Sequence, residues 1–253
     1  MTTSQIIKKA QDELNAMADR CLYMANRLER MAYDLNNATE DKDETDNGME
    51  ALEGLETVSK MLHAGQRPAV GQIVLSLMND GTEAVWRIID TKSMDVQNGV
   101  RPVVVQLVEI RDYKAFSAPS KEYPWGCNRY DISDVAEWLD DEFMENLTFA
   151  AESCIIPRHD LGGVNGRKLW LLSDEEAGFG DLDKAFEWYA CEDEDERKQR
   201  RQLQDMDGDA AYWWLRTPYS GVANFVRIVY TSGTLSNLGA DTASGVSPAC
   251  IIG

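Results

Sequence analysis

The last 37 residues of the chain, 217–253, contain no Lys, Glu, Gln, Met or Trp. At the frequency of these five types in residues 1–216, where 56 occur, the segment would hold about ten. It is rich in Ser, Thr, Gly, Val and Tyr, which favour short strands and turns over helices. The segment is therefore expected to be built of short strands, around 223–230 and at the terminus, with turns at Ser232-Gly233 and near Ser244-Gly245. Strand preference explains the deficit in Glu and Lys, but it leaves the absence of Trp and Met unexplained.

Charge is distributed unevenly between this segment and the rest of the chain. The formal net charge is −19, and residues 217–253 contribute only Arg227 and Asp241, which cancel. The excess negative charge thus lies in residues 1–216. An acidic body repels nucleic acid and anionic lipid, so neither a nucleic acid nor a membrane surface is expected as a partner.

The five cysteines are odd in number and contain no C-x-x-C pair, which argues against a disulfide framework or a zinc ribbon. Charged residues such as Lys8, Lys9 and Asp12 interrupt the first 30 residues. Neither a signal peptide nor a membrane span is therefore expected, and the protein is expected to be made in the cytoplasm.

The clearest periodic segment lies at residues 4–37. Apolar residues recur every seven positions in two interleaved series, which are Ile7, Leu14, Cys21, Leu28 and Leu35, and Ala10, Met17, Met24 and Met31. This heptad pattern predicts one long, coiled-coil-like helix within an N-terminal unit, 1–38. Two interpretations stay open: self-association of the helix into a homo-oligomer, and packing of the helix onto its own domain.

Residues 39–67 are expected to form an acidic linker and a short helix carrying Leu52, Leu55, Val58 and Leu62. From Val70 the apolar period changes to that of strands, with a hairpin signal at Asn79-Asp80-Gly81. An amphipathic helix is predicted at 131–147, capped by Asp131 or Ser133. A buried strand and a helix start at Ser173, with Glu176 completing a capping box, are predicted at 168–180. The fold class predicted for 68–253 is α+β.

The candidates for chemistry are weak. Cys154 and His159 lie five positions apart across a proline, a spacing typical of a loop. A calcium loop of the EF-hand type starting at Asp205 would require glutamate at its twelfth position, where the chain has Arg216. We therefore expect no catalytic residues, no metal and no cofactor, and the chain is not expected to be an enzyme. Trp213 and Trp214 are interpreted as a core pair, the alternative being a stacking platform for a sugar.

Five motifs occur in an order that resembles a known family. They are W-R-I-I-D (86–90), S-x-x-x-x-W-L-x-x-x-F (133–143), L-W-L-L-S-x-E-E-A (169–177), Y-W-W-L-R-T-P (212–218) and G-V-S-P-A (245–249). Residues 68–253 thereby resemble the C-type-lectin-fold proteins of the DUF6273 group, which include the variable proteins of diversity-generating retroelements. One departure is Ser247, where the family usually has arginine. The N-terminal helix lies outside the resemblance.

The resemblance implies a C-type lectin-like fold and a ligand-binding role. Retroelements of this kind mutate at template adenines, and an AAC or AAT codon changed at its first two bases can encode every residue except Lys, Glu, Gln, Met and Trp. Those are the five types missing from residues 217–253. The deficit would therefore follow from adenine-directed mutation of the codons of a variable region, 217–247. The implied ligand is a protein or glycan of unknown identity, as in phage receptor binding, which would place the protein on a virion.

In that interpretation a rigid framework carries exposed, replaceable side chains whose types suit a binding surface. The framework residues are Trp213, Trp214, Pro218, Ala223, Val226, Gly233, Gly245, Val246 and Pro248. The expected ligand-binding residues are Tyr219, Ser220, Val222, Asn224, Phe225, Arg227, Val229, Tyr230, Ser236, Asn237, Leu238, Asp241 and Thr242. The alternatives are an undiversified structural or carbohydrate-binding domain of the same fold, and a relative of the formylglycine-generating enzymes without their catalytic cysteines.

Overall fold

The computed structural model describes Lys8, residues 49–159, Val164 and residues 166–253. The chain divides into two compact units, Met1–Met49 and Glu50–Gly253, and the fold described below is that of the second unit. The heptad helix predicted within 1–38 and most of the predicted linker lie outside the described residues, and the oligomer interpretation rests on that helix.

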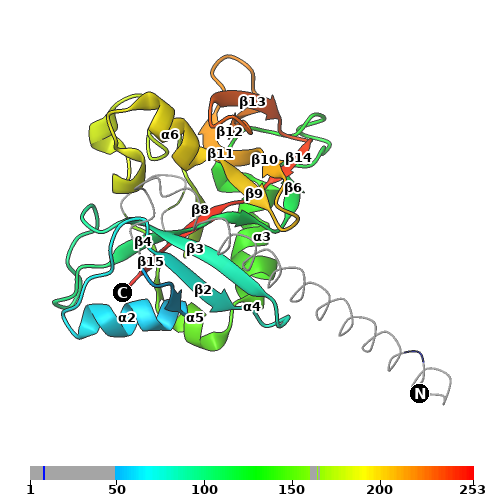
Figure 1. Ribbon diagram of the computed structural model, residues 1–253. Helices are drawn as coiled ribbons and strands as arrows, with labels where there is room; N and C mark the ends of the chain where they lie inside the picture. The colour runs from blue at the N-terminus through cyan, green and yellow to red at the C-terminus, as the bar shows by residue number, and fades with distance from the viewer. Residues whose placement is uncertain (1–7, 9–48, 160–163, 165) are drawn as a thin grey trace. The chain divides into compact units, whose positions relative to one another are not determined.

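The largest sheet contains seven of the strands formed by the described residues (Figure 1). In sheet order they are β1 (Leu52–Glu53), β2 (Ile73–Leu77), β3 (Glu83–Asp90), β4 (Val103–Leu107), β15 (Pro248–Ile252) and β7 (Ile155–Ile156), and β8 (Leu169–Leu171) also pairs with β15. The hairpin predicted at Asn79-Asp80-Gly81 joins β2 to β3, which are antiparallel. The last strand of the chain, β15, lies in the interior of this sheet, so the C-terminal residues complete the core.

The second sheet carries most of the segment with the restricted composition. Its strands, in order, are β13 (Leu235–Gly239), β12 (Phe225–Val229), β11 (Trp213–Pro218), β14 (Ala243–Gly245) and β6 (Tyr113–Ala115). A small third sheet contains β10 (Ala210–Ala211), β9 (Leu203–Asp205) and β5 (Glu109–Ile110). Short strands and turns therefore fill 217–253, as the composition predicts. The turn predicted near Ser244-Gly245 is wrong, because these residues lie in β14 and pair with β6.

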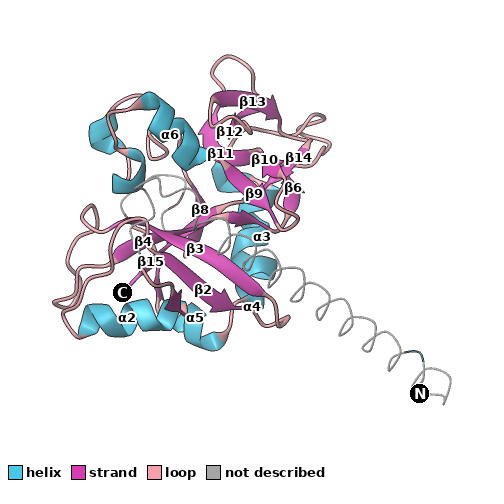
Figure 2. Cartoon of the chain, in the orientation of Figure 1, coloured by secondary structure: helices cyan, strands magenta, loops and turns pink. Residues whose placement is uncertain are grey.

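Helices are short and few in the described part of the chain (Figure 2). They are α2 (Leu55–His63), α3 (Asp134–Trp138), α4 (Met144–Asn146), α5 (Phe149–Ser153) and α6 (Glu194–Arg201), with a π-helical turn η2 (Leu139–Phe143) and 3-10 turns η1 (Tyr130–Ile132), η3 (Leu182–Lys184) and η4 (Glu187–Tyr189). The fold is thus a mixed one of several sheets and few helices, as the α+β class requires. No described helix has the length and apolar character needed to cross a membrane.

Local signals in the sequence set the ends of two of these elements. Ser133, one of the two predicted caps, accepts a hydrogen bond from the Ala136 amide at the start of α3. Ser173 and Glu176 form the reciprocal bonds of a capping box, Ser173 N to Glu176 Oε2 at 2.9 Å and Glu176 N to Ser173 Oγ at 3.1 Å. The helix predicted there does not form, however. Residues 174–178 make a single turn, and Gly178, with a positive φ of 74°, then changes the direction of the chain.

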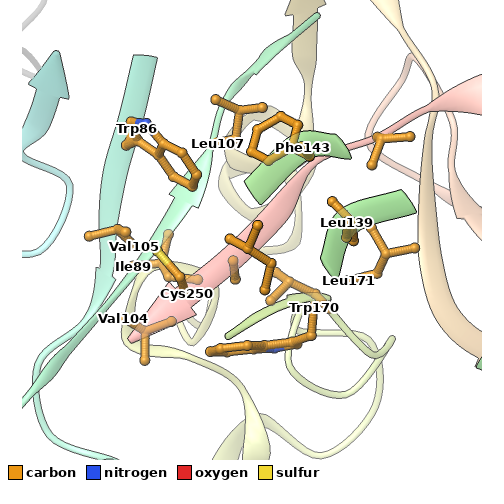
Figure 3. Packing of buried hydrophobic residues seen from close by; sticks show 14 of the residues in the cluster. Trp86, Ile89, Val104, Val105, Leu107, Leu139, Phe143, Trp170, Leu171 and Cys250 are labelled. Atoms are coloured by element: carbon orange, nitrogen blue, oxygen red, sulfur yellow. The ribbon is translucent and has the colours of Figure 1, made fainter. Parts of the chain in front are cut away.

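Four tryptophans anchor the core. Trp86, Trp170, Trp213 and Trp214 are fully buried, which confirms that the Trp213–Trp214 pair belongs to the core. In Figure 3, Trp86 points toward Phe143, and the two rings meet edge to face with centroids 6.4 Å apart. The inner strands of the main sheet are therefore held by large aromatic side chains as well as by backbone pairing.

Candidate ligand-binding face

The two faces of the β12–β13 hairpin differ in burial. Cross-strand partners lie on the same face of a sheet, and the register pairs Phe225 with Gly239 and Arg227 with Asn237. Phe225, Arg227 and Asn237 are only partly buried, whereas the intervening Val226 and Ile228 are in the core. The face of Phe225 and Arg227 is therefore open to solvent, and we call it the outer face.

Three side chains on and beside the outer face form one cluster. The rings of Tyr219 and Phe225 lie 6.5 Å apart at a tilted angle. The Arg227 guanidinium carbon lies 4.8 Å from the centroid of the Tyr219 ring, within the range of a cation–π contact. These residues, Tyr219, Phe225 and Arg227, are named the aromatic–arginine cluster. It combines apolar area with one positive charge on an otherwise nearly neutral segment.

The loop that joins β11 to β12 brings Tyr219 to this cluster. The Tyr219 amide donates to the Phe225 carbonyl at 2.9 Å, and the Phe225 amide donates to the Val222 carbonyl at 3.2 Å. Gly221 takes a φ of 89° with open space on its Cα, a conformation that suits glycine. The loop, residues 219–225, is thus a closed turn that presents Ser220 and Val222 to solvent.

The opposite end of the hairpin is covered by α6. The Trp213 indole donates to the Arg201 carbonyl at 3.0 Å, and Arg201 Nη1 donates to the Gly233 carbonyl at 3.0 Å. A Cβ on Gly233 would lie 2.0 Å from the Lys198 carbonyl oxygen, so the turn fits closely against the helix. The helix α6 therefore covers the turn at Gly233, although Tyr230 beside that turn is 50% exposed.

Three of the expected ligand-binding residues are not displayed on the outer face: Val229 shares the face of Arg227 but is buried, and Ser236 and Leu238 lie on the other face. Val229 is 0% exposed, in register with Trp213 and Leu235, at the end that α6 covers. Ser236 and Leu238 pair with Ile228 and Val226 and so share the core-facing side of the hairpin. The assignment of Val229 to an exposed set is corrected because it is fully buried, whereas Ser236 and Leu238 are partly exposed on the core-facing side.

The remaining residues fall into two groups in space. Those at the loop end of the hairpin are Tyr219, Ser220, Val222, Asn224, Phe225, Arg227, Asn237, Asp241 and Thr242, all exposed or partly exposed. Tyr230, 50% exposed, follows β12 at the other end. It lies five positions along an extended chain from Phe225, a span of about 17 Å. Among the residues assigned to the framework, Pro218 and Ala223 are exposed, and the other seven are buried.

A second loop, which sequence reasoning missed, borders the outer face. Residues 117–128 lie beside the Asn224–Ala240 region, since the Ser117 amide donates to Ala240 at 2.9 Å and the Asn128 amide donates to Ala223 at 2.9 Å. This loop carries Trp125, which is 67% exposed. No periodicity marks such a loop, because its partner is a segment nearly one hundred residues further along the chain.

Two of the described thiols, those of Cys154 and Cys250, give no sign of a nucleophile. Burial raises the pKa of the Cys154 thiol to about 11, and its sulfur contacts the Ala151 carbonyl at 2.9 Å. Burial also raises the pKa of Cys250, which is fully buried in β15. Both thiols therefore stay protonated at neutral pH and act as packing groups.

The acidic turn at Asp205–Asp209 is held by its own backbone. Asp205 Oδ1 accepts hydrogen bonds from the amides of Asp207 and Asp209, each at 3.0 Å. Within the described residues no group of three or more His, Cys, Asp or Glu side chains is placed to hold a metal ion. The turn thus has a structural explanation that requires no ion.

A shallow pocket of about 350 Å³ adjoins the loop end of the outer face. Its lining residues are Asn128, Arg129, Tyr130, Asp131, Arg216, Thr217 and Pro218. Its charges are largely paired internally, since Arg129 bonds Asp131 at 2.7 Å and Arg216 bonds Glu176. The pocket therefore offers a ligand mainly shape and neutral polar groups.

Comparison with known proteins gives one match. Residues 107–253, more than half of the chain, match the family described as "Domain of unknown function (DUF6273)". Searches of the curated proteins and of the solved structures gave no significant match. The matched range contains β11 to β15, the aromatic–arginine cluster and the loop that carries Asn128. On this match the chain belongs to the DUF6273 family.

Proposed function

We propose that the chain is a ligand-binding protein with a C-type lectin-like domain, residues 68–253, whose C-terminal segment is diversified by a retroelement. In this proposal the outer face is the binding surface. Side chains at the loop end of the hairpin vary between copies of the protein, while the strands beneath them stay constant. The ligand is a protein or glycan surface, and the chain binds it as a receptor-binding protein on a phage particle.

One observation carries the proposal. The aromatic–arginine cluster is partly exposed and belongs to a segment that lacks the five residue types which diversified AAC and AAT codons cannot encode. A β-rich terminus explains missing Glu and Lys, but Trp is favoured in strands and on binding surfaces. The restricted set of residue types coincides with a solvent-open face, which supports a binding surface whose residues are set by codon mutation.

The chemistry of the face suits varied ligands. Tyr219 and Phe225 are stiff aromatic groups, and burying either against a ligand would contribute about 1.5 to 3 kcal/mol. Ser220, Asn224 and Asn237 provide small polar groups that form adaptable hydrogen bonds. The rest of the chain is strongly acidic, so binding to an acidic ligand would be disfavoured at low ionic strength.

Self-association through residues 1–38 is part of the same proposal. Several copies of a modest site on one particle raise the overall avidity by a factor of about 10² to 10⁴ when the geometry allows simultaneous contact. A binding face with randomly varied side chains has a low affinity for its ligand at first. Several copies in an oligomer raise the total binding strength enough for such a variant to hold its ligand.

The proposal is tested by sequencing the gene from many individuals of one population. Substitutions should concentrate at the first two bases of the codons for Tyr219, Phe225 and Arg227. The codons for Trp213 and Trp214, only a few residues upstream, are the matched control and should stay constant. A near-copy of the coding segment should also lie beside a reverse transcriptase gene. Equal substitution rates in the two sets of codons, with no such copy nearby, would overturn the proposal.

A further inference from the structure

Asn128 holds the 219–225 loop by its backbone. Its side-chain nitrogen Nδ2 lies 3.0 Å from the Val222 carbonyl oxygen, 3.2 Å from that of Phe225 and 3.4 Å from that of Tyr219. Its own backbone amide donates to the Ala223 carbonyl at 2.9 Å. A single residue outside the loop thus meets four of the seven loop carbonyls.

A fifth carbonyl is held in the same way. The Ala240 amide donates to Asn224 at 2.8 Å, and the Ala240 carbonyl in turn accepts from the Ser117 amide at 2.9 Å. In these contacts the loop contributes only backbone oxygen atoms. Every residue type carries the same carbonyl group, so the bonds do not depend on which side chains the loop displays.

The geometry also explains why asparagine occupies this position. Its amide group carries two N–H donors, which three converging carbonyls share. Aspartate has the same shape but would place a negative oxygen against three carbonyl oxygens, and alanine would leave those acceptors without this donor. Each carbonyl group that stays buried without a hydrogen-bond partner destabilises the loop by its full desolvation penalty.

We propose that Asn128 is the positioning residue that fixes the path of the 219–225 loop, so that the loop's side chains can be exchanged without moving its backbone. This inference rests on the proposed function for the reason why exchange is useful. The set of hydrogen bonds from Asn128 to the loop carbonyls, which we call the Asn128 clamp, is a property of the fold and is tested without any ligand. It adds to the binding face a residue, outside the variable segment, on which the display of Tyr219 and Phe225 depends.

The test measures hydrogen exchange of the 219–225 segment by mass spectrometry on the full chain, in wild type and in Asn128→Ala. Exchange of this segment should become about tenfold faster in the variant, the change expected for the loss of one hydrogen bond of ordinary net strength. Asn79→Ala is the matched control, because Asn79 Nδ2 likewise bonds two carbonyls, Glu145 at 2.8 Å and Leu147 at 2.7 Å. The control should leave exchange in 219–225 unchanged.

A second variant separates a backbone clamp from side-chain packing. Replacing Tyr219, Ser220, Val222 and Asn224 together by Ser, Asn, Ser and Ser should leave the slow exchange of the segment intact while Asn128 is present. Adding Asn128→Ala to that variant should speed exchange by the same factor as in wild type.

Two outcomes would overturn the inference. One is slow exchange that persists in Asn128→Ala, and the other is fast exchange in the four-residue variant with Asn128 in place. Neither bears on whether the segment is diversified, which the sequencing experiment decides separately.

Discussion

Arg216 and Glu176 form a two-point ion pair in the interior of the domain, directly before the segment of restricted composition, 217–253, begins. Arg216 Nη2 bonds Glu176 Oε1 at 2.9 Å, and Arg216 Nη1 bonds Oε2. Arg158 Nη1 lies 2.7 Å from Glu176 Oε1 and is also buried. One carboxylate thus meets two guanidinium groups, and β11 is tied to the turn that follows β8 at the base of the displayed loop.

This ion pair predicts a pH-dependent stability. Burial alone would raise the pKa of Glu176, but Arg216, and then Arg158, outweigh it and hold the pKa below its ordinary value of 4.5. A carboxyl whose pKa is lowered by folding stabilises the protein fully above about pH 4.5, and that contribution is lost as the pH falls through the lower folded-state pKa. Glu176→Gln should lower the free energy of unfolding at pH 7 by about 3 to 5 kcal/mol, measured by urea denaturation.

The control for this prediction is the neighbouring Glu175, whose carboxylate pairs with Lys184 at the surface. Glu175→Gln should change the free energy of unfolding by less than about 1 kcal/mol. The difference between wild type and Glu176→Gln should shrink as the pH is lowered below 4.5, because the wild-type carboxylate then becomes protonated as well. A difference that stays constant down to pH 3 would contradict the assignment.

The order of the elements could be predicted from local signals. Alternating apolar residues and the Asn79-Asp80-Gly81 turn specify the β2–β3 hairpin, and Ser133 specifies the start of α3. The Ser173–Glu176 capping box shows the limit of such signals. Its bonds form as predicted, yet no helix follows, because Gly178 takes a positive φ and turns the chain.

The buried Ser247 leads to a second prediction. Tyr189 Oη donates to Gln106 Oε1 at 2.7 Å, Gln106 Nε2 donates to Ser247 Oγ at 2.8 Å, and Ser247 Oγ donates to the Leu107 carbonyl at 2.5 Å. The family resemblance leads one to expect arginine at this position, and a short polar chain occupies the site instead. Ser247→Ala leaves the Gln106 donor and the Leu107 carbonyl without this partner, so it should destabilise the fold by about 1 to 3 kcal/mol.

A double-mutant cycle with Gln106→Leu checks this prediction by chemical denaturation. The cost of Ser247→Ala should be smaller in the Gln106→Leu background, because the amide donor is then absent. Equal costs in the two backgrounds would mean that the hydrogen bond between these side chains contributes nothing measurable.

The candidate site was predictable in part only. The restricted alphabet marks the segment, and residues such as Tyr219, Phe225 and Arg227 follow from it. Which of its strand residues are exposed depends on the register of β12 with β13 and on the burial of Val229 at the end of the hairpin where α6 meets the Gly233 turn. Asn128 gave no signal, because its role comes from contact with residues far along the chain. Alternation within one strand defines two faces but does not say which of them is covered.

Assembly provides a third prediction, from the heptads at residues 4–37. Deleting residues 1–47 should leave a folded domain that is monomeric in light scattering, whereas the full chain should have the mass of an oligomer. The melting temperature of the deleted form is the control for folding. An oligomeric mass that survives the deletion would place the contact in the domain, and a monomeric full chain would remove self-association altogether.

The last prediction separates an exposed binding face from a core that is packed with aromatic residues. Tyr219, Phe225, Arg227 and Tyr230 are partly or largely exposed, and surface substitutions usually cost within about 0.5 kcal/mol each. Replacing all four with Ser or Asn should therefore lower the free energy of unfolding by no more than about 2 kcal/mol. Trp214→Ala should cost about 3 to 5 kcal/mol, because Trp214 is fully buried, packs edge to face on Phe116 at 5.5 Å and donates to the Lys114 carbonyl.

Urea denaturation of the two variants gives the comparison, and any ligand found by selection gives the second readout. The four-residue variant should lose that ligand while remaining folded. A buried aromatic residue cannot be removed so cheaply, since the cavity left behind is only partly filled by relaxation. If the four-residue variant proved as unstable as Trp214→Ala, the aromatic–arginine cluster would be part of the packing of the hairpin, and the binding face would have to lie elsewhere on the domain.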